Sequence, residues 1–140
     1  VSMISIPRDL YVQHENIISQ RINSVYENVS YKQGDEVAFE TLSEIAENIS
    51  GLDIHYFLKI DFNGLTEIVD RLGGVTIDVE ETIYDPFYPS SNYSYQTFAL
   101  GKGIQNLDGE TALKYVRSRK TTSDFARYQR QQKVIYAIKE

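Results

Sequence analysis

A predicted helix over residues 63–72, with a predicted strand on either side, is the feature that most constrains the fold of this 140-residue chain. Asn63 is a suitable N-cap, and the glycine pair at 73–74 supplies the stop signal. The apolar residues between them recur at the spacing of one helical face: Leu65, Ile68, Val69 and Leu72. Alternating runs over 54–61 and 75–79 predict the two strands. Strand, helix and strand in this order indicate a βαβ unit or an antiparallel variant of it.

The rest of the chain adds one strand and three helices to this unit. Alternating residues 1–6 predict a strand that stops at Pro7. Apolar periodicity predicts helices over 36–49, 107–116 and 123–139. Gly51 is the stop signal of the first of these. Residues 10–34 are predicted to be irregular, and residues 80–99 to form a long loop rich in Tyr, Pro, Ser and Asn.

No repeat or linker divides the chain, and its length suits one domain. We therefore predict the α/β class, as a single layered α-β-α domain over residues 1–140 with a mixed central sheet. Because the chain opens inside a predicted strand and without a start methionine, we expect a fragment that is incomplete at its N-terminus and lacks its first strands.

Positive charge gathers near the C-terminus of an otherwise acidic chain. Residues 114–133, the basic island, hold seven Lys/Arg and one acid, a net charge of +6, whereas the whole protein carries −6. Arginine binds phosphate bidentately, so the basic island predicts a site for a polyanion, most simply phosphate. The overall acidity argues against general nucleic-acid coating. With no cysteine and two histidines, thiol nucleophiles, cysteine–zinc sites and histidine-rich metal sites are excluded.

Two arginines of the basic island, Arg117 and Arg119, lie where the helix over 107–116 should end. Two residues apart on a helix, their side chains would diverge by about 200°. They can hold one ligand only if the chain leaves the helix between them, which Ser118 allows. A solvated basic helix end, favoured by the helix macrodipole, explains the pair as well.

The last predicted helix carries a polar stripe beside its expected buried face. Asp124, Arg127 and Gln131 share this stripe, which could close over the Arg117/Arg119 corner. An anion near the helix start would also meet free N–H groups. A capping pair of Asp124 with Arg127 on a polar surface is the alternative. The buried face should hold the large apolar side chains: Phe125, Tyr128, Ile135 and Ile138.

Arg8 and Asp9 follow the first predicted strand. In layered α/β folds, ligands meet the chain at the carboxyl ends of strands. Arg8 could therefore clamp a phosphate while Asp9 binds Mg²⁺, which prefers carboxylate oxygens. A β-turn after Pro7 explains the pair equally well. A Ca²⁺ site is also conceivable at three acids of the predicted loop, although solvated side chains explain them too: Glu80, Glu81 and Asp85.

Five motifs run in order over nearly the whole chain. They are Ser5-Ile6-Pro7-Arg8-Asp9, Arg21-Ile22-Asn23, Val69-Asp70-Arg71-Leu72-Gly73-Gly74-Val75, Leu107-Asp108-Gly109-Glu110-Thr111-Ala112-Leu113-Lys114-Tyr115-Val116-Arg117-Ser118-Arg119, and Ser123-Asp124-Phe125-Ala126-Arg127 with Arg130-Gln131-Gln132. Together they resemble the LytR–CpsA–Psr family. The resemblance implies a bacterial envelope phosphotransferase that moves a glycopolymer, such as teichoic acid or capsule, from an undecaprenyl-pyrophosphate carrier to peptidoglycan.

The resemblance also implies roles for the residues singled out above. The catalytic residues would be Arg8, Asp9, Arg117 and Arg119. The residues that hold the pyrophosphate would be Arg8, Arg21, Arg117, Arg119, Arg127 and Gln131. Asp9 would support Mg²⁺ as the cofactor. The family also has an upstream metal motif and a membrane helix, so we expect an extracytoplasmic protein anchored to the bacterial cell membrane through a missing N-terminal helix.

The site residues of the two ends of the chain are predicted to converge on one pocket: Arg8, Arg117, Arg119, Arg127 and Gln131. Two other functions share this clamp. A polyprenyl-pyrophosphate phosphatase or phosphodiesterase would use water as the nucleophile. A non-catalytic module for anionic polymers would need only the basic island.

Overall fold

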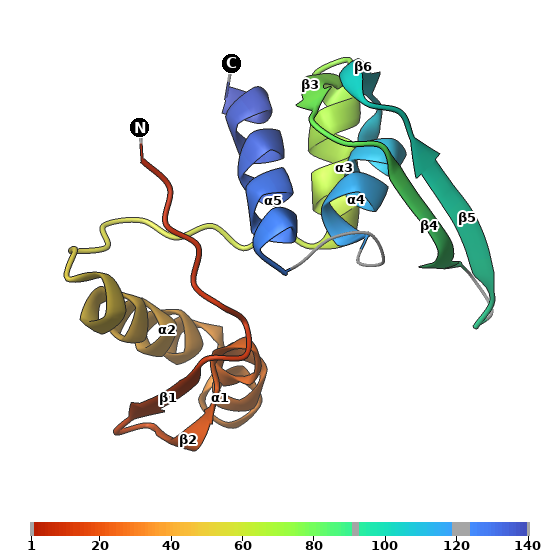
Figure 1. Ribbon diagram of the computed structural model, residues 1–140. Helices are drawn as coiled ribbons and strands as arrows, with labels where there is room; N and C mark the ends of the chain where they lie inside the picture. Colours follow the sequence, from red (N-terminus) through yellow and green to blue (C-terminus); the bar gives the residue numbers. More distant parts are fainter. Residues whose placement is uncertain (1, 91–92, 119–123, 140) are drawn as a thin grey trace. The chain divides into compact units, whose positions relative to one another are not determined.

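The computed structural model describes residues 2–90, 93–118 and 124–139 (Figure 1). The chain forms two compact units, Val1–Lys59 and Ile60–Glu140. The elements of the first unit are β1 (Tyr11–His14), β2 (Ile17–Arg21), η1 (Ile22–Ser24), α1 (Val25–Gln33) and α2 (Asp35–Ser50). Those of the second are α3 (Phe62–Arg71), β3 (Val75–Val79), β4 (Ile83–Pro89), β5 (Tyr95–Leu100), β6 (Gly103–Leu107), α4 (Gly109–Arg117) and α5 (Asp124–Lys139). None of the described helices is both long and apolar enough to span a membrane.

An antiparallel hairpin and two helices build the first unit. β1 and β2 pair with Tyr11 opposite Arg21. Gly34, at φ 94°, separates α1 from α2, and Gly51 ends α2 in the left-handed conformation at φ 71°. The predicted stop signal at Gly51 is thus confirmed. The buried apolar side chains form one cluster: Val12, Val25, Val29, Ala38 and Ile45.

Three predictions for this part of the chain need correction. Residues 2–6 and 54–61 alternate in sequence but belong to no strand, because extended backbone becomes a strand only beside a hydrogen-bonded partner. None of the described strands pairs with either segment. Tyr56 and Leu58 are accordingly exposed. The irregular structure predicted for residues 10–34 is also wrong, since β1, β2 and α1 lie there.

Two antiparallel strand pairs lie in the second unit. β3 pairs with β6, with Val75 opposite Leu107, and β4 pairs with β5 as a hairpin. The loop predicted over 80–99 is therefore wrong. Asp85 is the reason: it takes an inward position in β4 and is 3% exposed, so a charged residue interrupts the apolar alternation that marks a strand.

The predicted α/β class is confirmed, with a different arrangement of strands. The described strands form three two-stranded antiparallel sheets instead of one mixed central sheet. The predicted βαβ unit is not formed among them, because no described strand lies between α2 and α3 and β3 pairs with the distant β6. The predicted cap of α3 also shifts by two residues. Asp61 is the N-cap, where its Oδ1 accepts a hydrogen bond from the Gly64 N–H at 2.7 Å.

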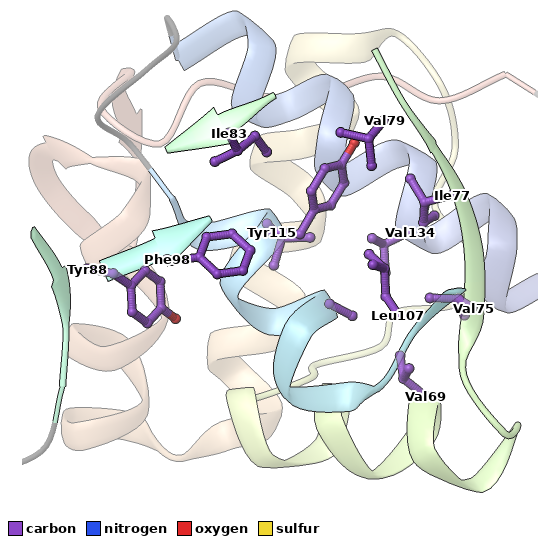
Figure 2. Packing of buried hydrophobic residues seen from close by; sticks show 12 residues of the cluster. Val69, Val75, Ile77, Val79, Ile83, Tyr88, Phe98, Leu107, Tyr115 and Val134 are labelled. Carbon is purple, nitrogen blue, oxygen red and sulfur yellow. The ribbon is translucent and has the colours of Figure 1, made fainter. Parts of the chain in front are cut away.

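The core of the second unit joins its helices to the inner faces of its strands (Figure 2). Its buried side chains are Val69, Val75, Ile77, Val79, Ile83, Tyr88, Phe98, Leu107, Ala112, Tyr115, Val116 and Val134. On α5 the buried face differs from the predicted one, because Phe125 is 68% exposed and Ile135 is 54% exposed. Arg127 and Arg130 are buried instead. A pattern based on apolar residues does not detect arginines that are buried.

α3 and α4 approach each other closely at Gly109. A Cβ atom at this position would lie 2.3 Å from the carbonyl oxygen of Thr66 on α3. The Gly109 N–H also donates to Asp70 Oδ1 at 2.7 Å, which satisfies one of the free donors at the start of α4. The two helices are therefore held together by backbone contact and by a hydrogen bond.

Asp108 caps α4, and its replacement by alanine should destabilise the fold by about 1 kcal/mol. Its Oδ1 accepts a hydrogen bond from the Thr111 N–H at 2.8 Å. Hydrogen bonds from Thr111 lower the pKa of the Asp108 carboxyl. The stabilisation is therefore complete above the unfolded-state pKa of about 4 and is lost as the pH falls through the lower folded-state pKa.

Urea unfolding of the wild type, Asp108→Ala and Asp108→Asn at neutral and acidic pH would measure this effect. The asparagine variant is the control, because its amide oxygen can still cap the helix without titrating. An Asp108→Ala protein with wild-type stability at neutral pH would contradict the prediction.

Candidate functional site

Arg117, the last residue of α4, presents a positive charge that the described residues leave without an ion pair. Its guanidinium carbon lies 4.2 Å from the centre of the Phe62 ring and 5.7 Å from the centre of the Tyr88 ring. Its Nη1 donates to the Tyr88 hydroxyl at 3.4 Å. These neutral contacts hold the half-buried guanidinium in place by cation–π attraction while leaving its charge available to an anion.

The chain leaves the helix directly after Arg117. Ser118 has φ −56° and ψ 134°, outside the helical region, so the break that a shared ligand would require begins at Ser118. The Ser118 side chain is buried, and its hydroxyl donates to Asp85 Oδ2 at 3.0 Å. Arg119 itself lies outside the described residues. Asp85 is therefore a buried anchor for this corner, so neither the solvated nor the Ca²⁺-binding role considered from the sequence holds for it, whereas Glu80 and Glu81 are exposed.

Arg130 supports the same corner from α5. Its Nη2 donates to the Ser118 carbonyl oxygen at 2.6 Å and its Nε donates to the Tyr115 carbonyl oxygen at 2.9 Å. Carbonyl groups at the end of a helix lack intrahelical partners and carry partial negative charge. By binding two of them, Arg130 lowers the repulsion that an anion beside Arg117 would meet. Burial lowers the pKa of Arg130 and raises that of Tyr115.

Sequence reasoning missed Asp85, Ser118 and Arg130 as a group. The signal that could have found them is the position of Arg130 on α5, three residues after Arg127 and four before Val134. That spacing places Arg127, Arg130 and Val134 on one face of the helix, and these three side chains are buried. An arginine on a buried face needs internal acceptors, which the free carbonyl groups at the end of α4 supply.

Two lysines of the basic island are neutralised locally. Lys133 Nζ lies 2.7 Å from Glu80 Oε1 and donates to the Asp78 carbonyl oxygen at 3.0 Å. The hydrogen bond from Lys133 lowers the pKa of the Glu80 carboxyl. Lys114 pairs with Glu110 across one helical turn at 2.6 Å. Arg117 thus differs from these two lysines, because no carboxylate of the described residues offsets its charge.

Arg127 and Gln131 lie one turn apart on α5, as predicted. Arg127 is 7% exposed and its guanidinium carbon lies 5.5 Å from the centre of the Tyr128 ring, whereas Gln131 is exposed. The polar stripe of α5 is therefore buried at Arg127 and exposed at Gln131. The alternative pairing of Arg127 with the Asp124 side chain lies outside the described side chains.

In the first unit, three predicted site residues lie together around a turn. The Leu10 N–H donates to the Pro7 carbonyl oxygen at 3.1 Å, which closes the β-turn that contains Arg8 and Asp9. Asp9 Oδ1 lies 3.9 Å from Arg8 Nε and 3.5 Å from Arg21 Nη1. Each of the three side chains is about half exposed. The β-turn considered from the sequence is therefore present, and the phosphate clamp at Arg8 stays a prediction.

The donor set around Asp9 fits a metal ion only in part. No group of three or more His, Asp or Glu residues in the described part of the chain could hold a metal ion. Asp9 supplies one carboxylate flanked by two guanidinium groups, which is a better setting for an anion than for a bare cation. Mg²⁺ needs one or two carboxylates, with phosphate oxygens and waters as its other ligands. The Asp9 carboxylate fits that ion once a phosphate group supplies further oxygens.

The two groups of site residues belong to different units. Arg8, Asp9 and Arg21 lie in the first unit, and Arg117, Arg127 and Gln131 lie in the second. Their convergence on one pocket stays a prediction.

Comparisons with known proteins place these residues in a family. The teichoic acid transferase TagU of Bacillus licheniformis, which is named for transfer from a polyisoprenyl carrier to peptidoglycan, is 32% identical over 97% of this chain and 40% of its own length. The crystal structure of Bacillus subtilis TagU matches with a TM-score of 0.68, 30% identity, and coverage of 95% of this chain and 51% of that one.

A structure of TagT with bound octaprenyl pyrophosphate lipid matches with a TM-score of 0.63 and 25% identity, over 95% of this chain and 49% of that one. The chain thus spans about two fifths of the curated relative and about half of the solved chains. The sequence model of the LytR_cpsA_psr family matches residues 1–140, and this chain belongs to that family.

Proposed function

We propose that this chain forms the pyrophosphate-binding part of a phosphotransferase that moves a glycopolymer from a polyprenyl-pyrophosphate carrier to peptidoglycan. The observation that carries the proposal is the ring-supported guanidinium of Arg117, which has no ion-pair partner among the described residues, in a member of this family. Relatives named as teichoic acid transferases, and the lipid-bound TagT structure, support the same chemistry. The protein would act outside the cytoplasm, held at the membrane by a segment beyond residues 1–140.

The proposed reaction is one phosphoryl transfer. A hydroxyl of the acceptor attacks the phosphorus on the glycopolymer side, its proton passes to a base or to solvent, and the bond to the polyprenyl phosphate breaks. Negative charge spreads over the phosphoryl oxygens in the transition state. Arg117, Arg119, Arg8 and Arg21 would stabilise that charge through charge-assisted hydrogen bonds. Arg127 and Gln131 would position the diphosphate.

Asp9 is the residue through which we propose Mg²⁺ dependence. Its carboxylate would hold the ion, which would supply positive charge to offset that of the leaving phosphate. Arg8 and Arg21 lie within 3.9 Å and 3.5 Å of the same carboxylate oxygen. The carboxylate would thus orient two phosphate-binding cations as well as the metal.

Asp9→Asn should reduce transfer at least about tenfold, because the amide keeps the shape and loses the charge that Mg²⁺ requires. The assay follows labelled glycopolymer from a polyprenyl-pyrophosphate donor to peptidoglycan fragments, with Mg²⁺ or with EDTA, using the natural protein that contains this chain. Asp53→Asn, an exposed carboxylate of the same unit, is the matched control.

The same assay separates the other functions of an arginine clamp. Release of the lipid phosphate without transfer of the glycopolymer would show that the protein is a hydrolase and not a transferase. Binding of the donor without turnover would leave a module for anionic polymers. An Asp9→Asn enzyme with wild-type turnover and unchanged Mg²⁺ dependence would mean that Asp9 only stabilises the turn after Pro7.

A further inference from the structure

The β4–β5 hairpin presents an uncharged aromatic surface in a chain rich in charge. Between Thr82 and Gly101 the one charged residue is Asp85, and it is buried. The same segment holds four of the 11 tyrosines and two of the six phenylalanines, with Ser, Thr, Asn and Gln between them. Figure 1 shows β4 and β5 as a long strand pair at one edge of the second unit.

The two faces of the hairpin have different roles. Its inner face enters the core through Ile83, Tyr88 and Phe98 (Figure 2). The outer face, which we call the aromatic face, exposes three large rings: Tyr84 at 55%, Phe87 at 51% and Tyr95 at 68%. The Phe87 and Tyr95 rings meet edge to face with centroids 5.9 Å apart, so the aromatic face is ordered by contacts of its own.

The hairpin is continuous with the candidate anion site. Tyr88 on β4 accepts a hydrogen bond from Arg117, and Asp85 on β4 accepts one from Ser118. The strand that carries Tyr84 and Phe87 on its outer face therefore carries, on its inner face, the contacts that fix Arg117. A polymer that reacts at the anion site would have this hairpin as its neighbour.

The chemistry of the aromatic face selects among polymers. Tyrosine offers a broad, rigid ring and a hydroxyl at low entropic cost, which suits ligands with both apolar and hydroxyl groups. Pyranose rings have that character, because their C–H faces stack on aromatic rings and their hydroxyls form hydrogen bonds. A polyanion or a nucleic acid would need cations, and residues 86–101 have none. A bilayer surface would favour an apolar face flanked by Lys or Arg.

We infer that the aromatic face binds an uncharged chain of pyranose sugars, the chemistry of the acceptor's amino-sugar strand. That this sugar polymer is the acceptor rests on the proposed function, whereas sugar binding by the hairpin does not. The anionic donor would be held by the arginines, and the neutral acceptor by the aromatic face. Substrate charge would thus direct the two polymers to different surfaces.

Nitrogen-15 NMR titration of this chain with a neutral N-acetylglucosamine tetramer tests the binding directly. We expect saturable shifts confined to residues 83–100. Tyr84→Thr combined with Tyr95→Thr should weaken binding about tenfold or more, since two stacking rings are lost. Tyr31→Thr, which replaces a still more exposed tyrosine on α1, is the control and should bind as the wild type does. Spectra of each variant confirm the fold.

Separate titrations distinguish this inference from the proposed function. Inorganic pyrophosphate should shift the amide signals of Arg117 and its neighbours, by the same amount in the wild type and in the double variant. In the transfer assay, the double variant should raise the KM for the acceptor while leaving kcat nearly unchanged. If the wild type did not bind pyrophosphate, the proposed function would be overturned, whereas the inference that the aromatic face binds sugar would stand.

Three results would overturn the inference itself. The first is the absence of tetramer shifts in the hairpin. The second is an unchanged affinity in the double variant. The third is a stronger response of the aromatic face to another partner, either glycerol-phosphate oligomers, vesicles of phosphatidylglycerol and phosphatidylethanolamine, or a second copy of the chain detected by sedimentation.

Discussion

Arg117→Ala is expected to reduce transfer roughly 10²-fold or more, the loss seen when one well-placed donor to a developing oxyanion is removed. Arg117→Lys should lose nearly as much. Lysine restores the charge, but its ammonium cannot stack flat on Phe62 while donating to Tyr88, so the charge would no longer be held in place. Steady-state transfer kinetics with the polyprenyl-pyrophosphate donor measure both losses.

Two controls separate the charge from its support. Arg71→Ala removes an exposed arginine that pairs with Glu67, and it should leave transfer unchanged. Tyr88→Phe removes the hydroxyl acceptor but keeps the ring, and its loss should be much smaller than that of Arg117→Ala. If Arg117→Lys were fully active, Arg117 would contribute only to the general positive field, and the proposed role of its planar group would be wrong.

Gly109→Ala should lower the free energy of unfolding by about 3 kcal/mol, the upper end of the usual cost of overpacking. The new Cβ atom would lie 2.3 Å from the Thr66 carbonyl oxygen and 2.8 Å from both the carbonyl carbon and Cγ2 of Thr66. Two of these three atoms are backbone, so α3 and α4 must separate to admit the methyl group. The helix propensity of alanine offsets only part of this cost, since it exceeds that of glycine by about 1 kcal/mol.

Urea unfolding followed by circular dichroism measures the change. Gly101→Ala is the matched control, because a Cβ atom there would meet only Gln105 Nε2, at the ordinary distance of 3.8 Å. Wild-type stability in Gly109→Ala would show that the two helices can separate without loss. A drop in stability that is equal in both variants would attribute the effect to glycine replacement in general.

The helices were the most predictable elements because their signals are local. Gly51 ends α2 and Asp108 caps α4, and each acts through contacts within a few residues. Strands depend on partners far along the chain. Residues 54–61 alternate as well as β3 does, yet only β3 finds a partner strand among the described residues. Alternation records a preference for extended backbone, and pairing decides whether it becomes a sheet.

The candidate site was predictable where charge is displayed and unpredictable where it is buried. Arg8, Asp9 and Arg21 were singled out from their motifs, and they do lie together. Asp85 and Arg130 were missed as supports because the contacts described above join them to a hydroxyl and to backbone carbonyl groups. Such partners leave no charge pattern in a sequence. Opposite charges within the chain can suggest a pair, whereas backbone acceptors become visible only once the chain is folded.

The aromatic support of Arg117 changes the thermodynamics of ligand binding. A free arginine side chain has about 2 kcal/mol of rotamer entropy, which a ligand must overcome if it orders the side chain on arrival. Phe62 and Tyr88 already restrict this guanidinium. Most of that entropy is therefore lost when the second unit folds, before any anion binds. The affinity of the site for a diphosphate accordingly depends on packing between α3, β4 and α4, including side chains that never touch the ligand.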